Sequence, residues 1–538
     1  MKRLFIALVV LLVCIVTILG CAKPAPITPS APASTPAPTA KPTSTAPAAE
    51  QPQYGGVLKM ITYKALSSLE APGEKLVAPG VTGPDSANII WDNILRFDVN
   101  GNWAPGLATN FQVSPDGKTV TLTLRKGIKF HDGTDCNAAA IASHLESQKP
   151  TVELFRTITS MDVIDDYTLR LQFPKFDAKL ANKMLVNGKA NSPTALAKPT
   201  TTENRQKDHI SGAGPFKYVE WKRDVTLKTV KFADYWDKGK PYLDGVEVLF
   251  FADATSALMA FETGVGQVIR NISPREATDL RAKGYSIGFA PAFTYTLQPD
   301  GANADSPFAK KGVREAVEYA LDKKALADSF GVGFSTTMDQ VFPAALPNGY
   351  NPAIKGRPYD PAKAKQLLAE AGYANGFKTS IYALMTDDRN LLVAVQTYLK
   401  AIGIDAELAL KGAPDFATLG NDGWKNGLRM RTYGLMPVAI EPLDGVWFKP
   451  NVARGESQSI YRAPGFLDTV AQAAAELNDA KRKALIDKAV QMAADEAMLI
   501  PFISWPQINA WTKSVHGMDD LLYPSFHVQQ YNNIWLSK

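Results

Sequence analysis

Apolar and polar residues alternate along several short stretches of this 538-residue chain. In residues 119–124 threonines alternate with valine and leucine, the period of two expected of a half-buried β-strand. The same alternation recurs at 169–173 and 246–250, and an apolar run at 57–63 predicts a first strand. Apolar residues three or four positions apart predict amphipathic helices at 313–321, 392–402 and 486–497. Because the two patterns interleave, the sequence predicts an α/β fold.

The first twenty residues have the layout of an export signal. Two basic residues precede an apolar run over 4–19, which is shorter than the roughly 20 residues that span a bilayer. The following sequence, Ile-Leu-Gly-Cys at 18–21, resembles the bacterial lipobox, in which the chain is cut before an acylated cysteine. A plain secretory signal with an incidental cysteine and an uncleaved anchor helix are the alternatives. We expect residues 1–20 to be removed and Cys21 to be lipidated, on the outer face of the cytoplasmic membrane.

Residues 21–53 consist mainly of proline, alanine, serine and threonine. Such a segment buries too little apolar surface to offset its chain entropy, so we expect it to be disordered. Proline-rich chains are extended by about 3.1 Å per residue, so the segment would act as a tether of at most roughly 100 Å. An O-glycosylated stalk is compatible with the same composition.

Charge and cysteine content narrow the possible partners. Without its first two basic residues the chain has 56 lysines and arginines against 53 acidic residues, a net charge of +3 with no dense basic run. We therefore expect no nucleic-acid partner. Cys136 is the third cysteine after Cys14 and Cys21, so the mature protein has no intramolecular disulfide. The 485 residues from 54 onward are too many for one core and suggest at least two lobes.

Several motifs occur in a characteristic order. The segments are PGLA at 105–108, SPDGK at 114–118, LRKGIKFHDG at 124–133, GAGPF at 212–216 and ADYWDKGKPYLDGVEV at 233–248. In this order and spacing they resemble the signature of the peptide/nickel-type, family 5 solute-binding proteins of ATP-binding-cassette (ABC) importers. The resemblance extends from residue 54 to the end of the chain.

This resemblance implies a type II periplasmic-binding-protein fold with two α/β lobes. Lobe I would comprise 54–292 and 508–538, with an extra subdomain at about 97–205, and lobe II would comprise 293–507. The strands that cross between the lobes would lie near 289–295 and 504–511. Hinge closure would trap a small organic solute or peptide, and the closed monomer would dock on the permease subunits of its importer.

Motifs for catalysis and metal binding are missing from the sequence. There is no G-x-S-x-G, H-E-x-x-H or phosphate-binding loop, so we expect no enzyme activity. The five histidines do not pair at ligand spacing, and we expect His131 to be a hydrogen-bonded turn residue rather than a metal ligand. We therefore expect no bound metal and no cofactor. A carrier of a metal chelate or another non-peptide ligand stays open as the alternative function.

One strand end departs from the family's peptide-binding pattern. In peptide-binding relatives an aromatic residue is followed three positions later by an aspartate that pairs with the ligand's α-ammonium. Aligning Tyr433 with that aromatic residue places Met436 where the acid would stand. Either Glu441 or Asp444 replaces the acid, or the ligand lacks a free amino terminus, and we favour the latter. Tyr433, Leu435 and Met436 would then form an apolar wall of the site, or simply pack at the strand end.

Two further segments correspond to cleft-facing parts of the family. Arg389, at the start of a predicted helix, is a candidate to bind a ligand carboxylate, unless it forms a surface ion pair with the aspartate at 387 or 388. The turn after the first strand, 63–69, places Tyr63, Ser67 and Ser68 as candidate ligand contacts. We expect Trp236 to pack rather than to bind ligand.

Overall fold

The computed structural model describes residues 51–63, 88–97, 102–150, 152–186, 188–198, 210–434, 438–447, 457–519 and 530–538. All the elements below belong to the compact unit Pro52–Lys538. The predicted signal, Cys21 and most of the predicted tether lie outside the described residues. Within the described ranges, no helix is both long and apolar enough to be a membrane span.

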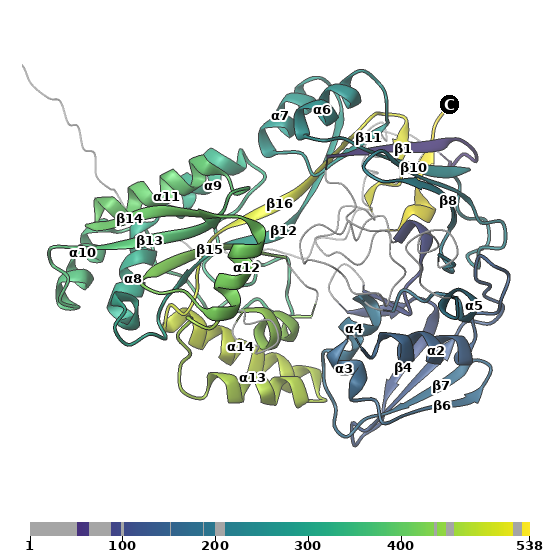
Figure 1. Ribbon diagram of the computed structural model, residues 1–538, viewed down its shortest axis with the longest axis horizontal. Helices are drawn as coiled ribbons and strands as arrows, with labels where there is room; N and C mark the ends of the chain where they lie inside the picture. Colours follow the sequence, from purple (N-terminus) through teal and green to yellow (C-terminus); the bar gives the residue numbers. More distant parts are fainter. Residues whose placement is uncertain are drawn as a thin grey trace, which may run out of the picture. The chain divides into compact units, whose positions relative to one another are not determined.

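A ten-stranded sheet is the main element of the fold (Figure 1). Its strands, in spatial order, are β14 (Ile404–Lys411), β13 (Phe377–Leu384), β15 (Gly427–Gly434), β12 (Ser286–Pro299), β16 (Ile500–Trp511), β11 (Val268–Arg270), β1 (Val57–Thr62), β10 (Gly245–Phe250), β9 (Thr226–Lys231) and β8 (Phe216–Lys222). We call β8, β9, β10, β1 and β11 the first half of the sheet, and β13, β14 and β15 the second half. The predicted strands at 57–63 and 246–250 are confirmed as β1 and β10.

The long strands β12 and β16 belong to both halves of the sheet. They pair antiparallel from Ser286 opposite Trp511 to Leu297 opposite Ile500, and they run side by side in Figure 1. β11 pairs with β16 at one end, and β15 pairs with β12 at the other. The two strands therefore connect the first half with the second.

The segments predicted to cross between lobes, 289–295 and 504–511, lie within β12 and β16. Pro291 stands opposite Pro506, and the register shifts directly after this pair. Because proline has no backbone N–H, this level of the ladder lacks donors on both strands. The pairing is thus interrupted inside the predicted crossing, although the lobe boundaries themselves stay a prediction.

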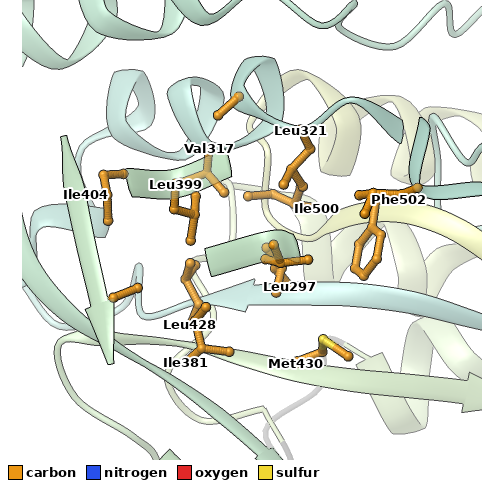
Figure 2. Packing of buried hydrophobic residues seen from close by; sticks show 14 of the residues in the cluster. Leu297, Val317, Leu321, Ile381, Leu399, Ile404, Leu428, Met430, Ile500 and Phe502 are labelled. Carbon is orange, nitrogen blue, oxygen red and sulfur yellow. The ribbon is translucent and has the colours of Figure 1, made fainter. Parts of the chain in front are cut away.

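Helices cover the second half of the sheet and enclose an apolar core. They are α8 (Lys311–Ala320), α9 (Lys323–Gly331), α10 (Pro361–Glu370) and α11 (Arg389–Ala401). Figure 2 shows residues of this core, including Val317 of α8, Leu399 of α11, Ile381 of β13 and Ile500 of β16. The predicted helical spacings at 313–321 and 392–402 are confirmed by α8 and α11, whose apolar faces supply this core.

A second apolar cluster adjoins β15 and contains residues of α12 (Ala413–Asp422), α13 (Phe466–Ala475) and α14 (Asp479–Asp495). α14 confirms the predicted helical spacing at 486–497. Between β15 and α13 a π-helical segment, Pro442–Trp447, packs against the same cluster through Leu443. We call this group of residues the α13 cluster.

The first half of the sheet packs against α6 (Ala254–Glu262) and α7 (Pro274–Ala282). α7 begins with a capping box, in which the Ser273 side chain accepts from the Glu276 amide and Glu276 accepts from the Ser273 amide. Near the carboxyl terminus, β17 (Val515–His516) pairs with β18 (Trp535–Leu536).

A separate four-stranded sheet has the order β4 (Ala108–Val113), β5 (Thr119–Leu124), β7 (Thr168–Gln172) and β6 (Ser160–Asp165). The alternations at 119–124 and 169–173 are confirmed as β5 and β7. Its own apolar cluster also receives residues of α2 (Ala138–Gln148), α3 (Glu153–Arg156) and α4 (Leu180–Val186), and α5 (Pro193–Leu196) lies beside α2. The hairpin of β2 (Leu95–Phe97) and β3 (Trp103–Pro105) precedes it. This body lies almost wholly within the segment predicted as an extra subdomain.

Candidate functional site

The carboxyl ends of two sets of parallel strands converge on the middle of β12. In the first half, β1, β10 and β11 are parallel. β11 ends at Arg270, which stands opposite Asn509 of β16, and Asn509 in turn stands opposite Gly288 of β12. In the second half, β13, β14 and β15 are parallel, and β15 ends at Gly434, opposite Phe293. The two sets run toward each other and stop about five residues apart along β12. Ligands of open α/β sheets bind outside the carboxyl ends of the strands, so this region is the candidate site.

On the first-half side, Tyr63 directly follows β1 and is partly buried. Its hydroxyl donates to the carbonyl of Asn271, which follows β11, at 3.1 Å. Burial raises the pKa of Tyr63, and the negative charge of Glu276 adds to the effect. The structure thus places this predicted residue at the converging strand ends, with its hydroxyl bound to the backbone. Ser67 and Ser68 lie outside the described residues.

On the second-half side, β13 is followed by a turn that leads into α11. Asp388 is the N-cap of α11 and accepts from the amides of Asn390 and Leu391 at 2.8 and 3.2 Å. Asp387 accepts from the amide of Leu384 at 2.8 Å. Both carboxylates are therefore bound to backbone amides, and neither forms an ion pair with Arg389. The Arg389 side chain is exposed at the first turn of α11, where it is available to a ligand.

Asp387 differs from its neighbours Thr386 and Asp388 in being partly buried, whereas both of them are exposed. Burial raises its pKa from 3.8 to about 6, and the only opposing contribution is the hydrogen bond from Leu384. Burial raises the pKa of Tyr295 on β12, and the negative charge of Asp387 adds to the effect. The Tyr295 ring contacts Trp505 of β16 edge to face, with the ring centres 5.6 Å apart. A carboxylate without a cation partner in the described part of the chain thus stands near aromatic residues of the two connecting strands. Sequence reasoning missed it, because nothing in the run Thr-Asp-Asp-Arg distinguishes a buried aspartate from a capping one.

Tyr433, near the end of β15, packs into the α13 cluster with 3% of its surface exposed. Its hydroxyl is hydrogen-bonded to the side-chain amide of Gln298, and the Arg431 guanidinium lies over its ring at 5.0 Å. These contacts fit the strand-end packing alternative better than an exposed ligand wall. Leu435 and Met436 lie outside the described residues, so their predicted contacts stay predictions.

The two acids that could replace the missing aspartate already have cation partners. Glu441 is paired with Lys183, and Asp444 is paired with Lys179. Both lysines come from the body that contains the four-stranded sheet. A ligand ammonium would have to displace a lysine to reach either acid.

The residues predicted not to bind metal or ligand have structural partners. His131 contacts Phe232 and hydrogen-bonds through Nε2 to the carbonyl of Gly214 at 2.9 Å, and burial lowers its pKa to about 4. Trp236 donates to the Asp92 carboxylate at 2.6 Å. The described residues contain no group of three or more side chains placed to hold a metal ion.

This combination of fold and site defines a class of protein: a two-lobed α/β receptor of the type II periplasmic-binding-protein fold, with an extra subdomain. The chain belongs to the bacterial extracellular solute-binding proteins, family 5, whose model for the middle part of the family matches residues 102–447. This confirms the resemblance carried by the motifs, and with it the assignment to ABC transporters.

Individual relatives agree with the family. The glutathione-binding protein GsiB of Shigella flexneri is 30% identical over 432 residues, which are 76% of this chain and 82% of the relative. Among solved structures, DppA from Helicobacter pylori in complex with the peptide STSA has a TM-score of 0.74 at 24% identity, covering 90% of this chain and 99% of that one. NikA from Brucella suis in complex with Fe(III)-EDTA has a TM-score of 0.77 at 20% identity, covering 89% and 100%. At these identities the two structures establish the fold alone. The family itself makes this chain an exported solute-binding protein.

Proposed function

We propose that this chain is the lipid-anchored receptor of an ABC importer, which captures a peptide or peptide-like solute by lobe closure and delivers it to the permease. Lobe I would be 54–292 and 508–538, with its subdomain at about 97–205, and lobe II would be 293–507. The observation that carries the proposal is the convergence of two sets of strand carboxyl ends on β12. A hinge at this level would bring both sets against one ligand. The role is binding, and we assign it no catalytic step.

The charges near the second-half strand ends support a ligand with both a cationic and an anionic group. Arg389 is exposed and suited to a carboxylate, whereas Asp387 is a partly buried carboxylate that a cation would stabilise. A peptide carries both charges, and relatives include glutathione-binding proteins and a protein solved with a peptide. Asp387 therefore offers an acid for a ligand ammonium, whereas the sequence alone favours a ligand without a free amino terminus.

We expect thermal unfolding to identify the ligand class. Reduced glutathione, short free-amino peptides and Fe(III)-EDTA would be added separately to the purified protein. A ligand at 100 times its Kd stabilises the folded state by about 2.7 kcal/mol, which raises the melting temperature measurably. A shift with glutathione or a peptide, and recovery of the compound unaltered by mass spectrometry, supports the proposal. A shift with Fe(III)-EDTA alone would instead favour the chelate-carrier alternative, for which NikA is the structural precedent.

The anchor makes a separate prediction. The variant Cys21→Ala is expected to lose incorporation of labelled fatty acid and to appear in the soluble fraction, because a single thiol carries the acyl chains that hold the protein on the membrane. Its thermal shift with the same ligand should be unchanged. The control is Cys136→Ala, which removes a buried thiol of the folded body and should keep the label. Persistent labelling of Cys21→Ala would place the anchor elsewhere.

A further inference from the structure

A short segment of the four-stranded body reaches across to the α13 cluster. Phe176 and Ala178 follow β7 in the chain, and both pack with residues of this cluster. The Ala178 amide donates to the carbonyl of Ala474 in α13 at 2.8 Å. The contact joins the predicted subdomain of lobe I to predicted lobe II without passing through β12 or β16.

Two ion pairs flank this backbone contact. Lys179 is paired with Asp444 of the π-helical segment, and its Nζ lies 3.3 Å from Asp177. One turn further along, Lys183 of α4 is paired with Glu441. Burial lowers the pKa of Lys179, but the charges of Asp177 and Asp444 outweigh it and raise the pKa overall, so the lysine stays charged at neutral pH.

The acidic partners, Glu441 and Asp444, belong to residues 438–447. Three residues separate this segment from the end of β15, one of the strands that form the candidate site. Any movement of the subdomain away from the α13 cluster must separate both ion pairs. Their side chains are 9–27% exposed, so water can reach all four charges once they part. The ion-pair part of this contact therefore opens at a lower free-energy cost than an apolar contact of the same size, whose surface would be left in water.

We propose that Lys179 and Lys183 form a reversible clasp, which fastens the subdomain to residues 438–447, holds the lobes closed and slows ligand release. The proposal rests on the proposed function, because it requires closure of two lobes around a ligand. The lysines act as positioning residues: they hold the segment after β15 and keep its two acids occupied. Ligand would be retained by contacts that lie partly outside the ligand site.

Hydrogen exchange of the ligand-free, full-length protein tests the clasp directly. In the double variant Lys179→Ala/Lys183→Ala, we expect peptides covering 174–186 and 466–477 to exchange about tenfold faster, because the Ala178–Ala474 hydrogen bond opens more often. Peptides covering β5 and β13 should be unchanged. The matched control is Lys324→Ala, which removes an exposed lysine paired with Asp328 within α9 and should alter neither segment. Unchanged exchange in both segments, or equally faster exchange along the whole chain, would overturn the proposal.

Swapping the two charges of one ion pair distinguishes the effect of the pair from other effects of the lysine side chains. Lys183→Glu alone should speed exchange in both segments, and adding Glu441→Lys should restore protection to within about twofold of the wild type, the coupling expected for two groups in contact. If the amides of Lys183→Glu/Glu441→Lys exchange as fast as those of Lys183→Glu, the ion pair does not hold the two segments together. In the wild type, protection should also fall between about 0.1 M and about 1 M salt, as the Debye length shrinks from about 10 to about 3 Å.

Binding of reduced glutathione, measured by surface plasmon resonance, distinguishes this proposal from the proposed function. With Lys179→Ala/Lys183→Ala we expect the dissociation rate constant to rise about tenfold and the association rate constant to change little. An unchanged dissociation rate would overturn the clasp's role in retention. If glutathione does not bind the wild type, the proposed ligand class fails, while the exchange measurements still decide whether the lysines hold the lobes together.

Discussion

Replacing Asp92 by alanine is expected to lower the free energy of unfolding by about 3–5 kcal/mol, because it leaves a buried cation without its partner. The Asp92 side chain is 9% exposed and accepts from Arg96 at 2.6 Å. Its second oxygen accepts from the Tyr235 hydroxyl at 2.9 Å and from the Trp236 indole at 2.6 Å. The alanine variant would leave three donors and one positive charge in a region that water reaches poorly.

Urea-induced unfolding followed by tryptophan fluorescence measures this effect. Asp92→Asn should be less destabilising than Asp92→Ala, since an amide oxygen still accepts hydrogen bonds while the charge is lost. The matched control is Asp328→Ala, whose carboxylate pairs with Lys324 on the exposed face of α9 and should change stability by about 0.5 kcal/mol or less. Equal effects of Asp92→Ala and Asp328→Ala would show that the Asp92 network contributes little net stability.

The network around Asp92 shows where prediction from sequence ends. Asp92 and Arg96 are four residues apart, a spacing that suggests an ion pair, but Tyr235 and Trp236 lie more than 140 residues away in the chain. Trp236 is predicted to pack, and its ring contacts two guanidinium groups: those of Arg125 and Arg96 lie 4.4 and 5.6 Å from the ring centre. The packing role was predictable from residue type, whereas its hydrogen-bond partner was not, because that partner is set by the tertiary fold.

Local patterns predicted elements well where one face of the element is buried. β5 alternates buried and partly exposed residues along its whole length, and α8 and α11 bury the predicted apolar stripes. The order of strands in the sheet has no such local signal. β1 pairs with β10 and β11, about 190 and 208 residues later, so the convergence of strand ends emerged only from the register.

The GAGPF motif illustrates a resemblance whose physical reason became visible only in the structure. A Cβ at Gly212 would lie 2.3 Å from the carbonyl oxygen of Ile90, and a Cβ at Gly214 would lie 2.6 Å from the same peptide group. Ala213, which lies between them, is buried in the apolar cluster of the four-stranded body. The two glycines are required because two backbones approach closely there. The residue between them is apolar because it packs in the core.

The candidate site was predicted less completely than the fold. Tyr63 and Arg389 stand at converging strand ends, but Tyr433 is packed inward, and nothing in the sequence distinguishes Asp387 as a ligand group. The reason is that a side chain's role at a strand end depends on which way the following turn folds. Residues 387 and 388 are chemically identical, and only the turn makes one a partly buried acid and the other an exposed helix cap.

Replacing Asp387 by asparagine is expected to stabilise the ligand-free protein at pH 7 and to weaken binding of a cationic ligand. Burial raises the pKa of Asp387 from 3.8 to about 6, so its ionised form is less stable in the folded chain than in the unfolded chain. The wild type therefore loses stability as the pH rises from about 4 to about 6, and asparagine removes that loss. The full shift corresponds to about 3 kcal/mol, and residual hydration of the side chain reduces the expected gain to about 1–2 kcal/mol above pH 6.

Melting temperatures of Asp387→Asn and wild type should accordingly coincide below about pH 4 and diverge above about pH 6. The matched control is Asp388→Asn, one residue along. Asparagine also caps a helix, but its loss of charge at the N-terminus of α11 should destabilise the protein by about 0.3–1 kcal/mol. The same substitution at adjacent positions thus has opposite expected signs.

Binding decides whether the buried charge serves a ligand. The ligand for this test is glutathione or the free-amino peptide, whichever gives the larger thermal shift. We expect Asp387→Asn to lower the affinity for this ligand by at least about tenfold, or 1.4 kcal/mol, because the ligand ammonium loses its counter-charge. Asp388→Asn should leave that affinity unchanged. If Asp387→Asn stabilises the protein and binds equally well, the carboxylate has no ligand role. If it lowers both stability and affinity, the carboxylate supports the turn between β13 and α11. A gain in stability together with a loss of affinity is the expected result for a charge kept in an unfavourable place because a ligand requires it.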